Sequence, residues 1–254
     1  MKTVLIPLAI ILITLVSCQK EDDRKNRTDD NRTIYFASTE LIDHKGTATI
    51  WKDGEVLFQT KKGDDNRISS IYVVGNDVYA AGYEYIGRTF TAKVWKNGEV
   101  LYQESEAFYS MANAIYVYGT DIYTAGFEGR DLAGKAIVWK NGEVLYRLTD
   151  GIHAGNAESI SISGNDIYVA GETVSNTSQI NALTWKNGKV LYDMENVNEL
   201  SIYIAGNDIY TLGYEYDEDY KRETPTVWKN GEFLYAIDKS YKNVSVSNIF
   251  VVNK

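Results

Sequence analysis

The stretch "VWKNGEVLY", Val94–Tyr102, decides the fold, because it reads as a strand, a tight turn and a second strand, and the chain repeats it almost unchanged. Asn-Gly between alternating apolar residues is a strong short-range signal for a two-residue hairpin, since both residues tolerate positive φ. The tryptophans of the five copies recur at spacings of 44, 44, 46 and 43 residues: Trp51, Trp95, Trp139, Trp185 and Trp228. One structural unit is therefore repeated along the chain.

A second phrase keeps the same period and completes the unit. It reads "GNDVYAAGYE" from Gly75, "GTDIYTAGFE" from Gly119, "GNDIYVAGET" from Gly164 and "GNDIYTLGYE" from Gly206. This phrase contains its own tight turn and predicts two more strands, so each unit becomes a four-stranded antiparallel meander. A period of about 40–45 residues with this pattern is that of one β-propeller blade. No segment shows the 3.6-residue periodicity of a helical solenoid.

The two ends of the repeat region carry complementary parts of one unit. "TIYFASTE", Thr33–Glu40, corresponds to the second strand of a unit, and "SVSNIFVVNK", Ser245–Lys254, corresponds to the first. An open solenoid would need polar capping repeats instead of matching halves. We therefore predict an all-β domain over residues 33–254, a five-bladed β-propeller closed by pairing the C-terminal strand with the N-terminal partial blade.

This plan resembles kelch and WD-repeat propellers, and five repeats with one tryptophan each are similar to tachylectin-type sugar-binding propellers. The resemblance covers residues 33–254 in plan only. The "GH…WD" signature and the paired glycines of kelch repeats are absent from this sequence, so no site residue is carried over from those families.

The N-terminus has the features of an export signal. "MKTVLIPLAIILITLVSC" has a basic start at Lys2 and a short apolar run over Val4–Val16, as in a secretory signal peptide, which we place at residues 1–17. The ending "LVSC" resembles the bacterial lipobox, and this resemblance implies that Cys18 is lipidated and begins the mature chain. A signal peptide with an incidental cysteine is the alternative.

The segment after that cysteine is almost free of apolar residues. Residues 18–32, "CQKEDDRKNRTDDNR", cannot bury enough surface to offset the entropy of ordering, so we expect a disordered tether. Its start, "CQKEDD", resembles the acidic signal that sends some Gram-negative lipoproteins to the outer face of the outer membrane; a simple spacer is the alternative reading. We expect a lipid-anchored outer-membrane protein that faces outward, with the periplasmic face as the alternative.

Composition excludes several classes of function. The formal net charge of −9 argues against nucleic acid, whose binding needs a basic surface. One cysteine and two widely separated histidines do not form a Cys/His metal cluster, so we expect no metal and no cofactor. We expect a monomer, with the membrane as its partner through the lipid anchor.

Candidate binding residues lie in the loops that differ from unit to unit, opposite the shared turns. A carboxylate near the end of each second strand predicts a ring of acidic groups, with local contacts inside each blade as the other reading: Glu40, Glu84, Glu128, Glu172 and Glu215. Four loop aromatics could stack on a sugar or a peptide: Tyr85, Phe108, Tyr109 and Tyr216. The five repeated tryptophans are interpreted as packing between blades.

These observations favour a binding protein whose ligand is a glycan or another surface protein. The alternative is a structural or assembly subunit of an outer-membrane complex. A glycoside hydrolase ranks behind both, because the sequence shows no paired-carboxylate, nucleophile or metal motif, and we expect no enzyme activity.

Overall fold

The computed structural model describes residues 32–42, 45–60, 65–105, 107–130, 134–175, 179–217, 223–237 and 245–252. The expected signal peptide, the lipidation of Cys18 and nearly all of the tether lie outside these ranges. Residues from Ile34 onward form one compact unit. No helix within the described ranges is long and apolar enough to cross a membrane.

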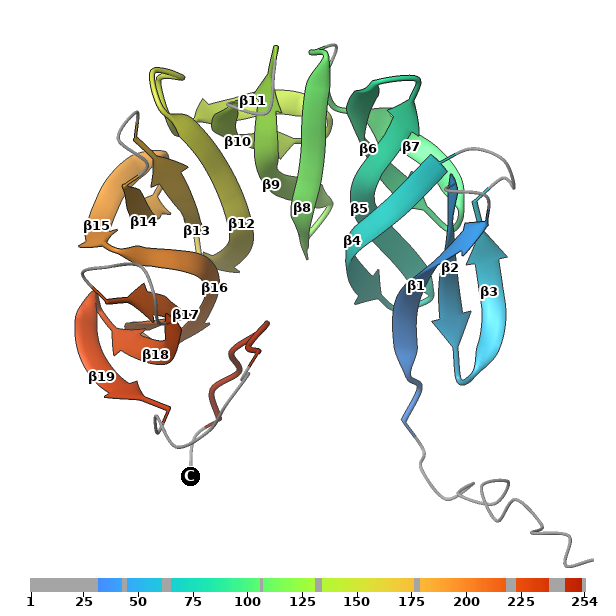
Figure 1. Ribbon diagram of the computed structural model, residues 1–254. Coiled ribbons are helices and arrows are strands. Elements are labelled where there is room, and N and C mark those ends of the chain that lie inside the picture. The colour runs from blue at the N-terminus through green and yellow to red at the C-terminus, as the bar shows by residue number, and fades with distance from the viewer. Residues whose placement is uncertain are drawn as a thin grey trace, which may run out of the picture. The chain divides into compact units, whose positions relative to one another are not determined.

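The described strands follow one another as antiparallel meanders (Figure 1). The first sheet contains β1 (Tyr35–Ile42), β2 (Lys45–Lys52) and β3 (Glu55–Gln59). The second contains β4 (Asp65–Val74), β5 (Asp77–Ile86), β6 (Thr89–Lys96) and β7 (Glu99–Gln103). The third contains β8 (Tyr109–Tyr118), β9 (Asp121–Gly129), β10 (Lys135–Lys140) and β11 (Glu143–Arg147).

The remaining strands form two further meanders. The fourth sheet contains β12 (Ala154–Ser163), β13 (Asp166–Val174), β14 (Ile180–Lys186) and β15 (Lys189–Glu195). The fifth contains β16 (Val197–Ala205), β17 (Asp208–Tyr216), β18 (Glu223–Lys229) and β19 (Glu232–Ala236). A single parallel bridge between Phe90 and Tyr109 joins the second sheet to the third.

The repeated turn residues form one polar cluster per sheet, which explains why the sequence repeats them. In the second sheet Asn97 has φ 51°, accepts a hydrogen bond from the Val78 amide at 2.9 Å and donates one to Asp77 at 2.9 Å. The ammonium of Lys96 lies 2.8 Å from the other oxygen of Asp77 and 5.1 Å from the ring centre of Tyr79. Hydrogen bonds from Lys96 and Asn97 hold the pKa of Asp77 below its ordinary value.

The same cluster recurs in the third, fourth and fifth sheets, where asparagine donates to aspartate and lysine pairs with that aspartate. In the first sheet Asp53 takes the asparagine's place and accepts a hydrogen bond from the Ile34 amide at 2.8 Å. We call this end of every sheet the turn end and the opposite end the loop end.

Aromatic residues fill the space between consecutive sheets. Trp185 of the fourth sheet packs in one cluster with Tyr123 and Val138 of the third, and Trp228 of the fifth sheet packs with Tyr168 of the fourth. Trp139 is fully buried. Trp95, Trp185 and Trp228 are also buried, whereas Trp51 is partly exposed. Aromatic side chains thus pack together with aliphatic residues between neighbouring sheets.

The first strands of the units lie next to one another: β4 contacts β8, β8 contacts β12, and β12 contacts β16. Figure 1 shows these strands on the inner side of the row of sheets. The Ile115 amide donates to the Ser70 hydroxyl at 3.4 Å, and the Ile202 amide donates to the Ser159 hydroxyl at 3.2 Å. Sheets whose first strands contact one another along the inner side are typical of the blades of a propeller.

The structure confirms the all-β prediction and the four-stranded meander as the repeated unit. The first sheet, as described, has three strands, and residues 245–252 form no strand pairing with β1.

Candidate functional site

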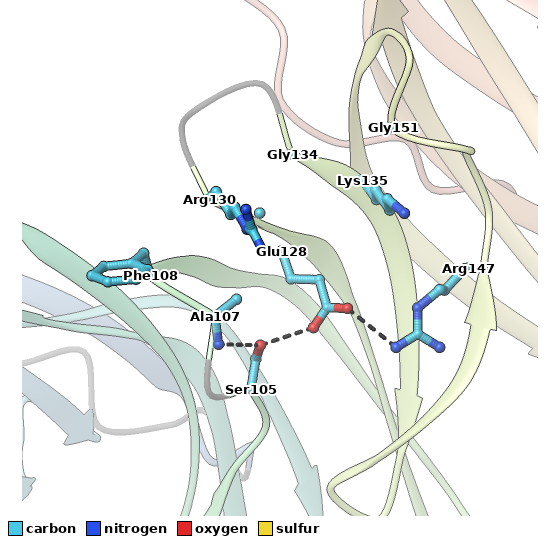
Figure 2. A pocket seen from close by; sticks show the side chains of 10 residues that line it. Ser105, Ala107, Phe108, Glu128, Arg130, Gly134, Lys135, Arg147 and Gly151 are labelled. Atoms are coloured by element: carbon cyan, nitrogen blue, oxygen red, sulfur yellow. Dashed lines mark hydrogen bonds and ion pairs between the residues drawn. The ribbon is translucent and has the colours of Figure 1, made fainter.

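A pocket of about 760 Å³ lies at the loop end of the third sheet (Figure 2). Its wall comes from four places in the chain: the link between β7 and β8, the end of β9 with the residue after it, the start of β10, and the end of β11 with the loop that follows. The side chains that give it chemical character are Ser105, Phe108, Glu128, Arg130, Lys135 and Arg147.

Glu128 lies at the centre of the pocket and is held from two sides. The Ser105 hydroxyl donates to one carboxylate oxygen at 2.8 Å, and Arg147 lies 3.5 Å from the other. The Ala107 amide in turn donates to the Ser105 hydroxyl at 3.1 Å, which orients it. Figure 2 shows Arg147 and Lys135 on one side of Glu128, and Ala107 and Phe108 on the other.

The backbone allows Lys135 to lie along the wall. Gly151 has φ +81°, and a methyl group at this position would come within 2.4 Å of the Lys135 side chain. The positive φ favours glycine here, and any larger residue would also displace the lysine side chain.

The pocket holds more positive than negative charge among its described lining residues. Three cationic side chains face one carboxylate, and within the described ranges neither Arg130 nor Lys135 has an ion pair. Phe108 lies at the rim with 66% of its surface exposed. The arrangement offers donors for an anionic group, a carboxylate acceptor and a flat apolar ring.

One residue beneath the pocket has an unusual environment. Glu104, next to Ser105, is buried, accepts a hydrogen bond from the Thr124 hydroxyl, and its second oxygen has no partner among the described residues. Burial raises the pKa of this carboxyl from 4.5 to about 7.

The five glutamates singled out from the sequence do not occupy five equivalent positions. Glu40, Glu84, Glu128 and Glu215 pair across the second hairpin with Thr47, Thr91, Lys135 and Thr224. In the fourth sheet the residue equivalent to Glu128 is Thr173, and Glu172 lies one residue before it on the strand. A shift of one residue places a side chain on the opposite face of a strand, so the expected five-fold ring is interrupted there.

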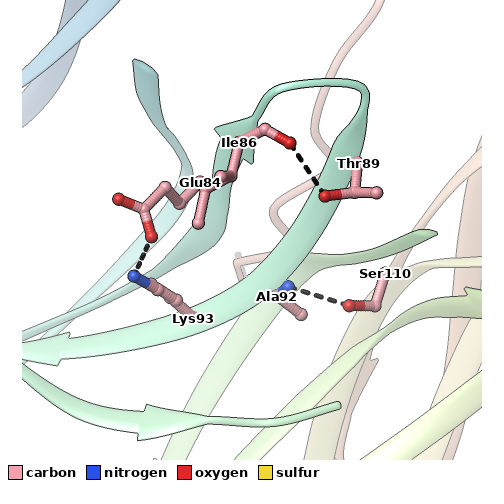
Figure 3. A network of polar contacts seen from close by, with 6 residues as sticks. All are labelled: Glu84, Ile86, Thr89, Ala92, Lys93 and Ser110. Carbon is pink, nitrogen blue, oxygen red and sulfur yellow. Dashed lines mark hydrogen bonds and ion pairs between the residues drawn. The ribbon is translucent and has the colours of Figure 1, made fainter. Parts of the chain in front are cut away.

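The individual glutamates have different surroundings. Glu84 forms an ion pair with Lys93 within the second sheet (Figure 3). Glu40 and Glu215 are exposed, and Glu172 lines a separate pocket of about 180 Å³. The structure therefore brings only Glu128 of this group into the 760 Å³ pocket.

The four loop aromatics also separate into different places. Tyr85 and Tyr109 both contact the ring of Phe90, at centroid distances of 4.9 and 5.8 Å, so they build an aromatic cluster between the second and third sheets. The Tyr216 hydroxyl accepts a hydrogen bond from Asn198 at 2.7 Å in the fifth sheet. Phe108 is the member of this group that lines the large pocket.

Sequence reasoning missed the cations Arg130, Lys135 and Arg147. A signal was present in the repeat. Lys135 stands where three other sheets have threonine and the fourth has Asn181, and Arg147 stands where the first two sheets have glutamine. No group of three metal-binding side chains was found within the residues that the structure describes.

No protein-family model and no curated protein matches the chain significantly. Among solved structures, the chain is similar to the GH32 β-fructofuranosidase of Bombyx mori, at 12% identity and TM-score 0.45, over 77% of this chain and 57% of that one. A mutant of that enzyme in complex with sucrose gives 12% identity and TM-score 0.45, over 76% and 59% of the two chains.

The acylaminoacyl peptidase of Pyrococcus horikoshii is similar at 14% identity and TM-score 0.45, over 82% of this chain and 37% of that one. The chain spans less than two thirds of each of these three structures. At such identities a likeness concerns the fold alone, and at these TM-scores we draw no argument from it.

Proposed function

We propose that this chain is a surface-anchored lipoprotein that binds an extracellular ligand, a glycan or a protein, through the loop end of its sheets. The observation that carries the proposal is the pocket of about 760 Å³, which combines the exposed ring of Phe108 with the carboxylate of Glu128 and three cations. Binding sites commonly combine apolar surface with a few convergent polar groups. The loops that form it are those that differ between repeats, whereas the turn end is nearly constant.

The anchor in this proposal is Cys18. The lipobox-like "LVSC" and the polar residues after it support lipidation at that residue and a tether to the outer membrane. We propose that the domain faces the outside of the cell, with the periplasmic face as the alternative. A second acyl chain, or a third, would make such anchoring stable, because one chain alone gives marginal binding.

We also infer that the domain is a closed five-bladed propeller. The segment 245–252 contacts the fifth sheet as an inner strand would. The Ile249 amide donates to the Ser201 hydroxyl at 3.4 Å, repeating the bonds that Ser70 and Ser159 accept in earlier sheets. The ring of Phe250 lies 4.8 Å from that of Tyr203.

One residue of the first sheet and one of the fifth sheet are left exposed where other sheets have a packing contact, and this also supports closure. In consecutive sheets the glycine of the Asn-Gly turn lies close to an aromatic ring of the preceding sheet, for example Gly142 against Tyr102. The next ring in this series, Tyr235, is 56% exposed, and the first glycine, Gly54, has open space around it. Closure would place Tyr235 against Gly54 and bury both.

The repeat predicts the register of closure. Ser70 of β4 faces Ala81 of β5, and the residues at the corresponding places are Asn248 and Ala37. A variant with Ala37→Cys and Asn248→Cys should form a disulfide in the purified chain, identified by peptide mapping. A variant with Ser38→Cys and Asn248→Cys, one residue out of register, is the control. Equal cross-linking of both pairs, or of neither, contradicts closure in this register.

Ligand binding is tested on a glycan array and by pull-down of surface proteins with the purified full chain. The variant Phe108→Ala with Glu128→Gln removes the pocket's ring and its negative charge. Phe233→Ala is a matched control, because Phe233 is also an exposed aromatic residue, at 62%, but lies on β19 away from the loop end. Binding that the pocket variant loses and the control keeps supports the proposal, and binding unaffected by the pocket variant contradicts it.

The second candidate is a structural or assembly subunit of an outer-membrane complex. It is favoured by apolar side chains exposed on the outer strands: Val56, Leu57, Val100, Leu101, Val190, Leu191, Phe233 and Leu234. Loss of partner binding in Phe233→Ala, with the pocket variant unaffected, would favour this candidate.

A glycoside hydrolase is less well supported than either of these two candidate functions. Such an enzyme uses two carboxyl groups at a defined separation, and Glu128 is the one carboxylate among the described lining residues of the pocket.

A further inference from the structure

We propose that the pocket binds a saccharide that carries an anionic substituent, a carboxylate or a sulfate. This inference rests on the proposed function, because it names the ligand class of the same site. It is drawn from the charges of the pocket, from the position of Glu128 and from the way these side chains depart from the repeat.

The lining of the pocket is positively charged, whereas the whole chain is negatively charged. The chain has a formal net charge of −9, yet three cations, Arg130, Lys135 and Arg147, gather around one carboxylate. Within the described ranges Arg130 and Lys135 have no ion pair, and Arg147 is held only by a long contact of 3.5 Å to Glu128. Cations that are not already paired are available for an anionic ligand group.

Packing does not account for these cations. Lys135 lies across the hairpin from Glu128, whereas the same place holds Thr47, Thr91 and Thr224 in three other sheets. Arg147 pairs with Ile137, and the equivalent residues of the first two sheets are Gln59 and Gln103. The first two sheets therefore fold with uncharged residues at both places, and the fourth sheet has Asp193 at the place of Arg147. The repeated fold does not require a cation at either place.

A simple anion would use only part of the pocket. It would pair with the cations but would donate no hydrogen bond to the carboxylate of Glu128, which also lines the pocket. The same carboxylate has lone pairs left for further donors beyond Ser105 and Arg147. A ligand that suits the whole pocket has an anionic group for the cations and neutral hydroxyl donors for Glu128.

The rim and the size of the pocket agree with a sugar. The exposed ring of Phe108 offers a flat apolar surface on which one face of a pyranose ring can stack. A volume of about 760 Å³ falls within the range of roughly 300–1,000 Å³ that holds small-molecule ligands, so one short acidic oligosaccharide fits.

The experiment is isothermal titration calorimetry on the purified full chain in detergent micelles. Four probes are compared: tri-galacturonic acid, galactotriose as its neutral counterpart, neocarrabiose 4-sulfate, which carries a sulfate and no carboxylate, and hexaglutamate as an acidic peptide. We expect the carboxylated or the sulfated saccharide to bind, more weakly as salt increases, and galactotriose to bind at least ten-fold more weakly. The first and third probes distinguish the two sources of negative charge.

Variants taken from the repeat itself keep the test independent of folding. Lys135→Thr with Arg147→Gln introduces the residues that other sheets already carry at these places, and we expect at least a ten-fold loss of acidic-saccharide affinity. Arg88→Gln is the matched control, since Arg88 is an exposed cation near the loop end of the second sheet and does not line the pocket. It should bind like the parent.

The outcomes separate this inference from the function on which it rests. Equal binding of acidic and neutral saccharides, lost in Phe108→Ala but not in the double variant, overturns the anionic class and leaves a glycan-binding site. Hexaglutamate bound as tightly as the acidic saccharides overturns the saccharide assignment. No binding of any probe also overturns it, while the pull-down of surface proteins still tests the wider proposal.

Discussion

Glu104→Gln tests how burial of one carboxyl group affects the stability of the junction between the second and third sheets. Glu104 follows β7 and contacts Thr124 of β9, and one of its carboxylate oxygens has no partner among the described residues. Burial raises its pKa from 4.5 to about 7. Because the folded state holds this proton more tightly than the unfolded state, folding takes up a proton between these two pH values.

The sign of the effect follows from that proton uptake. Below pH 4.5 both states are protonated at this group, so it adds no pH dependence. As the pH rises toward 7 the free energy of unfolding falls, and above the folded pKa the loss levels off. A rise from 4.5 to about 7 corresponds to about 3 kcal/mol, at roughly 1.4 kcal/mol for each pH unit.

The assay is urea unfolding followed by tryptophan fluorescence at pH 5 and pH 8, for the parent and for Glu104→Gln. Glutamine keeps the shape and cannot ionise. The variant should therefore gain stability relative to the parent by about 2–3 kcal/mol between pH 5 and pH 8, because a part of the parent's loss already occurs below pH 5. Glu99→Gln, on the exposed outer face of β7, is the control and should show no such gain. The same stability difference between parent and Glu104→Gln at both pH values would refute the reasoning.

Three further predictions concern the turn cluster, the core and the anchor. Asn97→Ala should cost about 3 kcal/mol of unfolding free energy, and Asn97→Gly about 2 kcal/mol, because both lose the bonds to Asp77 and Val78 but only alanine is strained at φ 51°; urea unfolding measures both, and equal costs would show that the positive φ contributes nothing. Trp139→Ala should cost about 4 kcal/mol in the same assay, because the side chain is fully buried, and a cost below about 1 kcal/mol would contradict its place in the core. Cys18→Ser should abolish incorporation of an alkyne-labelled fatty acid and release the chain from the membrane fraction; unchanged labelling would contradict lipidation at that residue.

The fold could be predicted from the sequence because turn chemistry and packing repeat with it. Asn97 has positive φ in its own turn, and its side chain bonds to Asp77 and Val78 beside the other turn of the sheet. Lys96 pairs with the same aspartate. The three residues "KNG" therefore specify the local geometry almost by themselves. Trp185 and Trp228, each two residues before such a turn, pack against the preceding sheet, and the spacing of the tryptophans gives the length of the repeated unit. Short-range hydrogen bonding of this kind is visible in a sequence without any knowledge of distant contacts.

The candidate site could be predicted only in part, because its geometry depends on register and on neighbouring loops. A constant spacing of 44 residues aligned Glu172 with Glu128. The distance from Trp139 to Trp185 is 46 residues, however, and the strand register makes Thr173 the equivalent of Glu128. Arg147 and Ser105 come from different loops and meet only at Glu128. Such contacts are not encoded in local spacing.

A repeated scaffold gives a direct way to distinguish structural from functional residues within one chain. A side chain that packing requires recurs at its place in sheet after sheet, as the tryptophans do. Lys135 and Arg147 break the repeat at places where threonine or glutamine suffices for folding, and both lie beside Glu128. Three cations gathered from separate strands around one carboxylate leave positive charge that Glu128 alone does not balance, and an anionic ligand group would balance it. We therefore propose that these departures from the repeat mark the binding site, and the repeat itself supplies the substitutions that test this proposal.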